Sequence, residues 1–274
     1  MKFNSELPKC MFDQNIHLND YDFVLFHLYL KDESYRNYYK ELRKNHRNRV
    51  MILDNSAYEF FVSGEVLDLV KFSEAIHELV PDYYILPDVL MDKNATIEKT
   101  KEFLYKYGVP SNPMAVVQGN SESEMLECIW IYKAMGIDSI AIPFHNSFFK
   151  SIIPSTDILN QFISKYHYIN DDLKYAMGRI EFIKNNIENI IDMFGYVHIL
   201  GSHCPYEAKW YESYEIDSMD TGYPVKLGVA GVEYGMEKNK PNIIIDEFFD
   251  HELSNDTMEL IIRNINTMKS DASK

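Results

Sequence analysis

The sequence predicts an α/β protein with the fold of a (β/α)8 TIM-type barrel, with helices at its C-terminal end and no zinc subdomain. Short apolar runs alternate with amphipathic helix-like segments, which is typical of βαβ units around a parallel sheet. Eight such runs can be distinguished. The 274 residues suit one barrel, because single barrels commonly reach about 200–250 residues or more. We therefore expect one domain over residues 1–274.

The eight predicted strands are apolar runs bounded by turn residues. They span residues 22–28, 49–53, 82–86, 113–117, 139–143, 196–200, 215–219 and, on the weakest pattern, 226–229. Helix-like periodicity covers the segments between them, namely residues 33–46, 65–79, 92–107, 121–135 and 156–193. The last of these is long enough for two helices.

Signals at helix ends support these boundaries. Ser121 and Glu124 form a predicted capping box, with serine as N-cap and glutamate at the third helical position. Gly136 then predicts the end of that helix. Residues 246–268 carry apolar side chains at mostly helical spacing, so we expect a terminal helix or helix pair that packs on the outside of the barrel.

Composition places the chain among globular proteins, with 46% hydrophobic and 25% charged residues. The N-terminus lacks the apolar core of a secretory signal, and the sequence has no run of 18 uncharged apolar residues, so we expect a cytoplasmic protein without a membrane partner. Cys10, Cys128 and Cys204 lie too far apart for a disulfide framework or a metal knuckle, which predicts reduced thiols.

The net charge of −15 argues against a broad electrostatic grip on nucleic acid, whose non-specific binding depends on Lys and Arg. A nucleic-acid substrate would therefore need local contacts. The densest basic stretch supplies Arg43, Arg47 and Arg49 as candidate phosphate contacts, and the alternative is a solvated helix end.

Polar residues directly follow four of the predicted strands. In a barrel the chemistry lies at the C-terminal ends of strands, so these residues are the candidates for a site. We expect three carboxylates and one amide to meet over one mouth, from Asp54, Asp88, Gln118-Gly119 and Asp220.

Each of these residues also has a structural explanation. Asp54 and Asp88 suit helix N-caps, because Asp accepts hydrogen bonds from free backbone N–H groups. Gln118-Gly119 suits a simple turn, and Asp220-Thr221-Gly222 suits an Asx-turn. His198 lies within an apolar run and suits a core histidine, and His203-Cys204 lacks further well-spaced ligands, so we predict no metal site.

Together the motifs resemble the tRNA-guanine transglycosylase superfamily, particularly its small relatives that insert 7-deazaguanine bases into DNA. The resemblance covers about residues 51–226. The segment from Asp54 to Glu59 is similar to the family's D-S-G-G-[FY]-Q, in which the Asp is the general base and the aromatic ring stacks on the bound base. The resemblance therefore gives these roles to Asp54 and Tyr58.

The resemblance also assigns the remaining site residues. Met219-Asp220, followed by Pro224 and Lys226, resembles F-D-C-V-x-P-T-R, in which the Asp is the nucleophile. The other matches imply base-binding residues. Asp88 matches the aspartate that reads the guanine edge, and Gln118-Gly119 belong to a segment similar to the family's V-Q-G. Leu200 and Gly201 end a strand similar to the family's Y-L-M-G beside the base pocket. Lys226 becomes a further candidate phosphate contact.

Four departures from the family pattern matter. The C-x-C-x-x-C and histidine zinc site is absent from the sequence, which predicts no structural zinc. Pro143-Phe144 replaces a G-G pair, and Lys226 replaces an arginine. The 48 residues after Lys226 are too few for an RNA-binding domain of the archaeal kind, which favours DNA over tRNA as substrate.

The expected activity is base exchange through a covalent Asp220–sugar ester, with retention at C1′. Asp54 transfers protons, and Asp88 and Gln118 select guanine-type bases. Tyr58 stacks on the extruded base, which is worth about 1–3 kcal/mol and offsets part of the cost of extrusion. The co-substrate is a 7-deazaguanine such as preQ0, without any other cofactor, and the partners are DNA and either a second copy of the chain or a helper protein.

Three alternatives remain open. The first is a tRNA enzyme of the same superfamily. The second is an unrelated barrel lyase or hydrolase in which Asp54, Asp88 and Asp220 bind Mg²⁺. The third is a catalytically silent barrel that binds a nucleobase or a protein. The leading interpretation is a DNA enzyme of phage origin that acts in the host cytoplasm.

Overall fold

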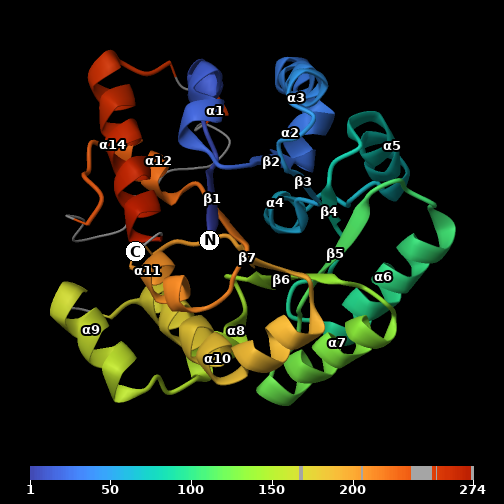
Figure 1. Ribbon diagram of the computed structural model, residues 1–274, viewed down its shortest axis with the longest axis vertical. Coiled ribbons are helices and arrows are strands. Elements are labelled where there is room, and N and C mark those ends of the chain that lie inside the picture. Colours follow the sequence, from blue (N-terminus) through green and yellow to red (C-terminus); the bar gives the residue numbers. More distant parts are fainter. Residues whose placement is uncertain (167–168, 205, 236–248, 251, 273–274) are drawn as a thin grey trace. The chain divides into compact units, whose positions relative to one another are not determined.

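The strands form one parallel sheet. The computed structural model describes residues 1–166, 169–204, 206–235, 249–250 and 252–272, and within them the sheet has eight strands in the order β1-β8-β7-β6-β5-β4-β3-β2. The pairs β1–β8, β2–β3, β3–β4, β4–β5, β5–β6 and β7–β8 are parallel, and helices follow the strands along the chain (Figure 1). This is the topology of a (β/α)8 TIM-type barrel, and the predicted fold class is confirmed.

The chain folds into two compact units, each built from separate stretches. The first unit comprises Met1–Asp20, Ser147–Ile191 and His198–Lys274, and the second comprises Tyr21–Asn146 and Asp192–Val197. Because neither unit is continuous in sequence, the division marks no linker, and one domain over residues 1–274 stays a prediction.

Five strands and six helices of the described residues belong to the second unit. The strands are β2 (Asp22–Leu25), β3 (Met51–Asp54), β4 (Tyr83–Ile85), β5 (Asn112–Val116) and β6 (Ser139–Pro143). The helices are α2 (Phe26–Lys31), α3 (Glu33–Asn45), α4 (Ala57–Ser63), α5 (Leu69–Leu79), α6 (Lys93–Lys106) and α7 (Glu122–Ala134). β2, β3 and β6 are buried at every residue, as expected for a parallel sheet that is covered on both faces.

Local signals explain most of these boundaries. α5 begins later than predicted because Asp68 is its N-cap and accepts hydrogen bonds from the N–H groups of Val70 and Lys71. Ser121 caps α7 as predicted, but the Glu124 carboxylate accepts from Asn120 N–H, one residue before the cap. The predicted strand 22–28 stops at Leu25, where α2 begins.

The first unit contains the strands at the β1 end of the sheet order and the longest of the described helices. Its strands are β1 (Lys2–Ser5), β7 (Tyr196–Leu200) from His198 onward, and β8 (Ser218–Thr221). Its helices are η1 (Lys9–Gln14), α1 (Asn15–Leu18), α8 (Ser147–Ser151), α9 (Thr156–Tyr166), α10 (Asp171–Met193) up to Ile191, α11 (Glu207–Trp210), η2 (Tyr211–Ser213), α12 (Tyr223–Val229) and α14 (Asn255–Asp271). The prediction of two helices in residues 156–193 is confirmed by α9 and α10.

The predicted strand 226–229 is wrong, because these residues belong to α12. Pro224 lies in the first turn of α12, where its fixed φ favours a helix and its missing N–H costs nothing. α12 packs against α14 (Figure 1), and a Cβ at Gly228 would lie 2.4 Å from Ile261 Cγ1. Glycine therefore permits the close approach of the two helices.

The eighth strand is instead β1, which the hydrophobic pattern missed. Its sequence is Lys-Phe-Asn-Ser, with a single apolar residue. Asn19 satisfies the buried backbone of this strand, because its side chain accepts from Ser5 N–H at 2.7 Å and donates to Ser5 C=O at 2.9 Å. A polar strand of this kind has no apolar alternation from which it could be recognised.

The terminal helix is confirmed in part. α14 begins after the N-cap Ser254, which accepts from Thr257 N–H. Residues 246–248 and 251 of the predicted segment 246–268 lie outside the described residues. Among the described helices, none is both long and apolar enough to cross a membrane.

Candidate active site

Asp54 ends β3 and shapes the turn into α4. It is 7% exposed, and its Oδ2 accepts a hydrogen bond from Ser56 N–H at 2.8 Å. α4 begins at Ala57, so Asp54 is not the N-cap of this helix. Asp54 therefore forms an Asx-turn with Ser56, and its carboxylate lies at the strand end.

Ser56 has a left-handed backbone conformation, with φ of +55°. For a residue other than glycine this conformation costs on the order of 1–3 kcal/mol and persists where neighbours fix it. His27 fixes it here, because its backbone N–H donates to Ser56 Oγ at 3.1 Å and its Nδ1 lies 3.0 Å from the same oxygen. Ser56 occupies the position of the first glycine in the D-S-G-G-[FY]-Q pattern, where a positive φ is unstrained.

Asp88 connects the ends of three strands. Its Oδ1 accepts from Asn55 Nδ2 and its Oδ2 accepts from Gln118 Nε2, both at 2.8 Å. The same two amides are bonded to the backbone, with Asn55 donating to Leu86 C=O and Gln118 accepting from Met91 N–H. Asp88 is not a helix cap, because the N-cap of α6 is Asp92.

Burial raises the pKa of the Asp88 carboxyl, although the hydrogen bonds from Asn55 and Gln118 oppose the rise. Gln118 itself is completely buried. In this structure Gln118 therefore orients Asp88, and its contact with a base stays a prediction.

The substitution Asp88→Asn is expected to change how stability depends on pH. Since the pKa of Asp88 is higher in the folded protein than in the unfolded chain, the free energy of unfolding of the wild type falls as pH rises from the unfolded pKa through the folded pKa. The variant lacks this loss. Urea denaturation at pH values from about 4 to about 7 measures the free energy of unfolding of both proteins. The value for the variant minus the value for the wild type should increase with pH and then become constant. A difference that does not change with pH would contradict the raised pKa.

Gly119 lies so close to the first turn of α7 that no side chain fits at this position. A Cβ at this position would lie 2.9 Å from both Glu124 Cβ and Met125 N, in the first turn of that helix. The Gly119 C=O also accepts a hydrogen bond from Asn146 Nδ2 at 3.0 Å. Gly119 therefore fixes the loop that carries Gln118.

Gly119→Ala is expected to destabilise the fold by about 1–3 kcal/mol, because backbone atoms of α7 must move. Gly108→Ala is the matched control, since a Cβ there meets nothing within 4 Å and the backbone has no positive φ. Its effect should stay within about 1 kcal/mol. Urea denaturation of both variants measures the difference, and equal stabilities would remove the packing role of Gly119.

Tyr58, on α4, stacks on an imidazole. Tyr58 is 36% exposed, and the centroid of the His145 ring lies 4.8 Å from that of the tyrosine ring, with an angle of 7° between the two planes. The Phe144 ring meets His145 edge-on, at 5.1 Å and 89°. The aromatic residues that follow β6 thus place a flat heteroaromatic ring on the side chain that the resemblance assigns to base stacking.

Asp220 occupies the corresponding strand end in the first unit. It lies in β8, is 2% exposed, and its Oδ1 is 3.0 Å from Gly201 N and 2.9 Å from His198 Nε2. Among the described residues no hydrogen bond reaches its Oδ2. One oxygen is therefore held in place, while no described donor bonds the other.

His198 links Asp220 to Ser218 within the sheet. Its Nδ1 lies 2.8 Å from Ser218 Oγ, so the three side chains have the order of a Ser-His-Asp triad. Ser218 is completely buried in β8, where a substrate carbonyl cannot reach it. We therefore interpret His198 as a residue that orients Asp220. The sequence indicated only a core histidine, because the pairing depends on the register of β7 against β8.

The predicted phosphate contacts lie elsewhere. Arg43 donates to Asp82 and to Val80 C=O, and Arg49 donates to Asp22 and to Tyr21 C=O. These partners precede or begin strands of the second unit, so both arginines lie at the opposite strand ends from Asp54.

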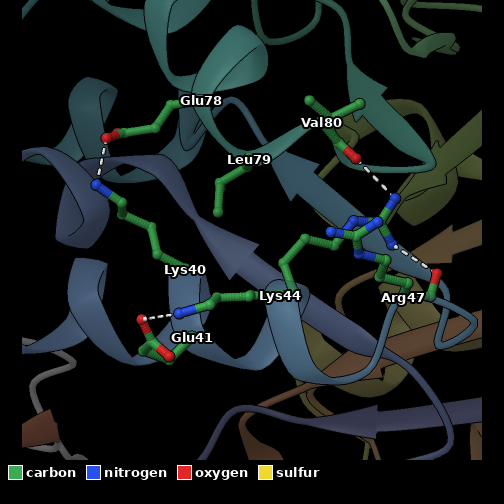
Figure 2. Close-up of a pocket in the computed structure, with 8 residues that line it drawn as sticks. Lys40, Glu41, Lys44, Arg47, Glu78, Leu79 and Val80 are labelled. Carbon is green, nitrogen blue, oxygen red and sulfur yellow. Dashed lines mark hydrogen bonds and ion pairs between the residues drawn. The ribbon is translucent and has the colours of Figure 1, made fainter.

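Arg47 lines a groove between the last turn of α3 and the end of α5 (Figure 2). Lys40 and Lys44 line it too, but Glu78 and Glu41 pair with them. Lys226 is 8% exposed and lies on α12. The structure therefore does not bring Arg43, Arg47 or Arg49 together with Asp54, and their phosphate role stays a prediction, as does that of Lys226.

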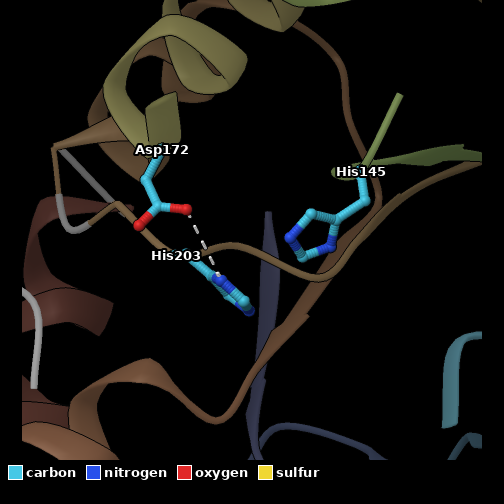
Figure 3. A group of neighbouring side chains, drawn as sticks. All are labelled: His145, Asp172 and His203. Carbon is cyan, nitrogen blue, oxygen red and sulfur yellow. Dashed lines mark ion pairs between the residues drawn. The ribbon is translucent and has the colours of Figure 1, made fainter. Parts of the chain in front are cut away.

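Asp172 and His203 form an ion pair in the first unit (Figure 3), with 3.9 Å between Oδ1 and Nδ1. His203 follows β7, three residues after Leu200, and Asp172 lies in the first turn of α10. Cys204 and Cys128 are buried and Cys10 is exposed, and none of the three forms a disulfide within the described residues. The expectation that the protein holds no metal stays a prediction.

A comparison with protein-family models gave no match, and a comparison with curated proteins gave none either. The fold and the site thus define a (β/α)8-barrel protein with aspartates at its strand ends. Because this fold hosts many activities, the residues at the strand ends are what distinguish one function from another.

Proposed function

We propose that this protein is a guanine transglycosylase that replaces guanine by a 7-deazaguanine base in DNA. The observation that carries the proposal is the state of Asp220, a nearly buried carboxylate at a strand end with Oδ1 held by two donors. A fixed carboxylate with an available second oxygen suits nucleophilic attack at a sugar carbon. The motif resemblance and the turn at Ser56 support the same assignment.

In the first step Asp220 Oδ2 attacks C1′ of the deoxyribose, and the bond between C1′ and guanine N9 breaks. The bonding electrons leave with the guanine, which takes a proton from the Asp54 carboxyl. The product of this step is a sugar ester on Asp220 and a free guanine. Gly201 and His198 hold the attacking group in one orientation, which reduces the entropy that the reaction must lose.

In the second step the incoming 7-deazaguanine gives its N9 proton to the Asp54 carboxylate, and N9 attacks C1′. The ester bond breaks, and its electrons return to Asp220 as a carboxylate. The hydrogen bonds to Oδ1 stabilise the charge that reappears there. Two displacements at C1′ give retention of configuration, and Asp54 ends as it began.

Base recognition is assigned to Asp88 and Tyr58. A carboxylate offers about four acceptor positions, so Asp88 can accept from the guanine N1–H and N2–H₂ while its bonds from Asn55 and Gln118 persist. Adenine lacks this pair of donors. A base that stacks on the face of Tyr58 now covered by His145 must displace the imidazole, because the 4.8 Å between the rings leaves no space for a third.

The test is to incubate the protein with guanine-containing DNA, with tRNA and with a panel of 7-deazaguanines, and then to identify the nucleosides by mass spectrometry. We expect a deazaguanosine in DNA, and the same result in EDTA. Modification of tRNA alone would overturn the choice of DNA. Loss of exchange in EDTA would favour a metal-dependent reaction, and an absence of modification in both polymers would contradict the proposed function.

A further inference from the structure

We infer that the buried pair Arg179 and Glu207 is a positioning unit for Asp220. It holds the chain that leaves β7 so that Gly201 N–H points at Asp220 Oδ1. This inference rests on the proposed function for its effect on reaction rate, while the positioning itself can be measured without substrate. Every contact that carries it lies within the first unit.

Arg179 reaches the β7 end from α10 with all three nitrogens of its guanidinium. Its Nη1 donates to Leu200 C=O at 3.1 Å, and its Nη2 donates to Gly201 C=O at 2.7 Å. Its Nε donates to Glu207 Oε1 at 2.7 Å. The planar fork of an arginine fits this arrangement, in which two consecutive carbonyl groups are held at once.

Glu207 completes the unit from α11. Besides Arg179 it accepts hydrogen bonds from Ser202 Oγ at 2.7 Å and from Tyr211 O–H at 2.6 Å. Burial, and then the neighbouring Glu207, raise the pKa of Tyr211 well above its ordinary value, so Tyr211 remains a donor. Both charges of the pair are therefore compensated within the unit.

The unit acts on the part of the chain that touches Asp220. Gly201 has a φ of +67°, which turns its C=O toward Arg179 while its N–H donates to Asp220 Oδ1 at 3.0 Å. A second bond joins the same segments, because Thr221 Oγ1 donates to Ser202 C=O at 2.6 Å. The segment that leaves β7 is thus fixed by Arg179 on one side and attached to the end of β8 on the other.

Burial at this site indicates a role beyond packing. Arg179 and Glu207 are both completely buried, and a buried ion pair often contributes no more stability than apolar side chains of similar volume. Gly178 lets α8 approach the same part of α10, because a Cβ there would lie 1.9 Å from Phe149 O. The fold therefore brings a charged fork to two carbonyls beside the proposed nucleophile.

The experiment uses the full chain with Arg179→Met and Glu207→Leu combined, so that no unpaired charge stays buried. Arg179→Lys is a second variant, which keeps the charge but replaces the planar fork by a single ammonium group. Lys269→Met is the control, because Lys269 also bonds a carboxylate and a carbonyl, those of Asp20 and Leu18.

The first measurement needs no substrate. In protein labelled with ¹⁵N-glycine, the Gly201 amide is assigned by its loss in Gly201→Ala. In the wild-type protein, Asp220→Asn should shift this resonance. In the double variant Arg179→Met and Glu207→Leu, we expect the same substitution to shift it far less. An equal shift in a folded double variant would overturn the positioning role.

The second measurement is the single-turnover rate of ester formation on Asp220 with guanine-containing DNA. We expect the double variant to lose about 10²-fold in this rate and Arg179→Lys to lose about 10-fold, because small displacements of reacting groups are costly. Lys269→Met should react at the wild-type rate. Wild-type rates in the folded Arg179 variants would overturn the inference, whereas a wild-type protein that forms no ester would overturn the proposed function and leave the amide measurement to decide the positioning.

Discussion

Asp220→Asn is expected to abolish base exchange, with a loss on the order of 10⁴-fold or more, because an amide oxygen cannot displace the base from C1′. The protein should remain folded, since the amide oxygen can still accept from Gly201 N–H in place of Oδ1. The measurement is the release of guanine from DNA per enzyme, together with the mass of the intact protein, which should show no sugar adduct.

The companion variant Asp220→Ala removes the hydrogen-bond acceptor as well as the charge, whereas Asp220→Asn removes only the charge. It leaves His198 and Gly201 without their acceptor, which costs about 1–3 kcal/mol of stability for a buried donor. Both variants should be inactive, while urea denaturation should show the larger loss of stability for alanine. Exchange at a tenth of the wild-type rate in either variant would remove Asp220 from the role of nucleophile.

Asp54→Asn is expected to stop the reaction after its first half. An asparagine can donate a hydrogen bond to the departing guanine, but it cannot take the N9 proton of the incoming base, so turnover should fall about 10²- to 10⁴-fold. The turn should survive, because the amide oxygen can still accept from Ser56 N–H. The sugar ester on Asp220 should therefore accumulate.

Intact-protein mass spectrometry over time provides the readout for Asp54→Asn. The wild type should show a small steady level of adduct, and the variant a level near one per protein. Repeated turnover by the variant without adduct would show that another group transfers the proton.

The sheet could be predicted from sequence wherever its strands are apolar. The predicted strands at residues 139–143 and 196–200 have the observed bounds, since both runs are apolar apart from Ser139 at the start of one and His198 in the middle of the other. β1 could not be found, because buried Asn4 and Ser5 interrupt the pattern. Residues 226–229 were misassigned because a short apolar run suits a strand and a helix equally, and the packing of Gly228 on Ile261 decides between them.

The sequence predicted where the polar residues at strand ends lie, while their functional roles stay predictions. Asp54, Asp88 and Gln118 lie at the ends of successive strands, and one hydrogen bond joins Gln118 to Asp88. The residues that orient the carboxylates were not predictable, since Arg179 lies within α10 and meets Gly201 only through the tertiary fold. The basic cluster near residue 43 was predicted to contact phosphate, but Arg43 bonds Asp82 and Arg49 bonds Asp22. The sequence alone does not reveal these tertiary partners.

The most direct test of the nucleophilic role of Asp220 is to mix the protein with guanine-containing DNA in the absence of any incoming base, quench rapidly, digest with protease and map the modified peptide. The proposed mechanism predicts one deoxyribose ester, located on Asp220. An ester on another residue, or base release without any covalent adduct at the earliest times, would contradict it.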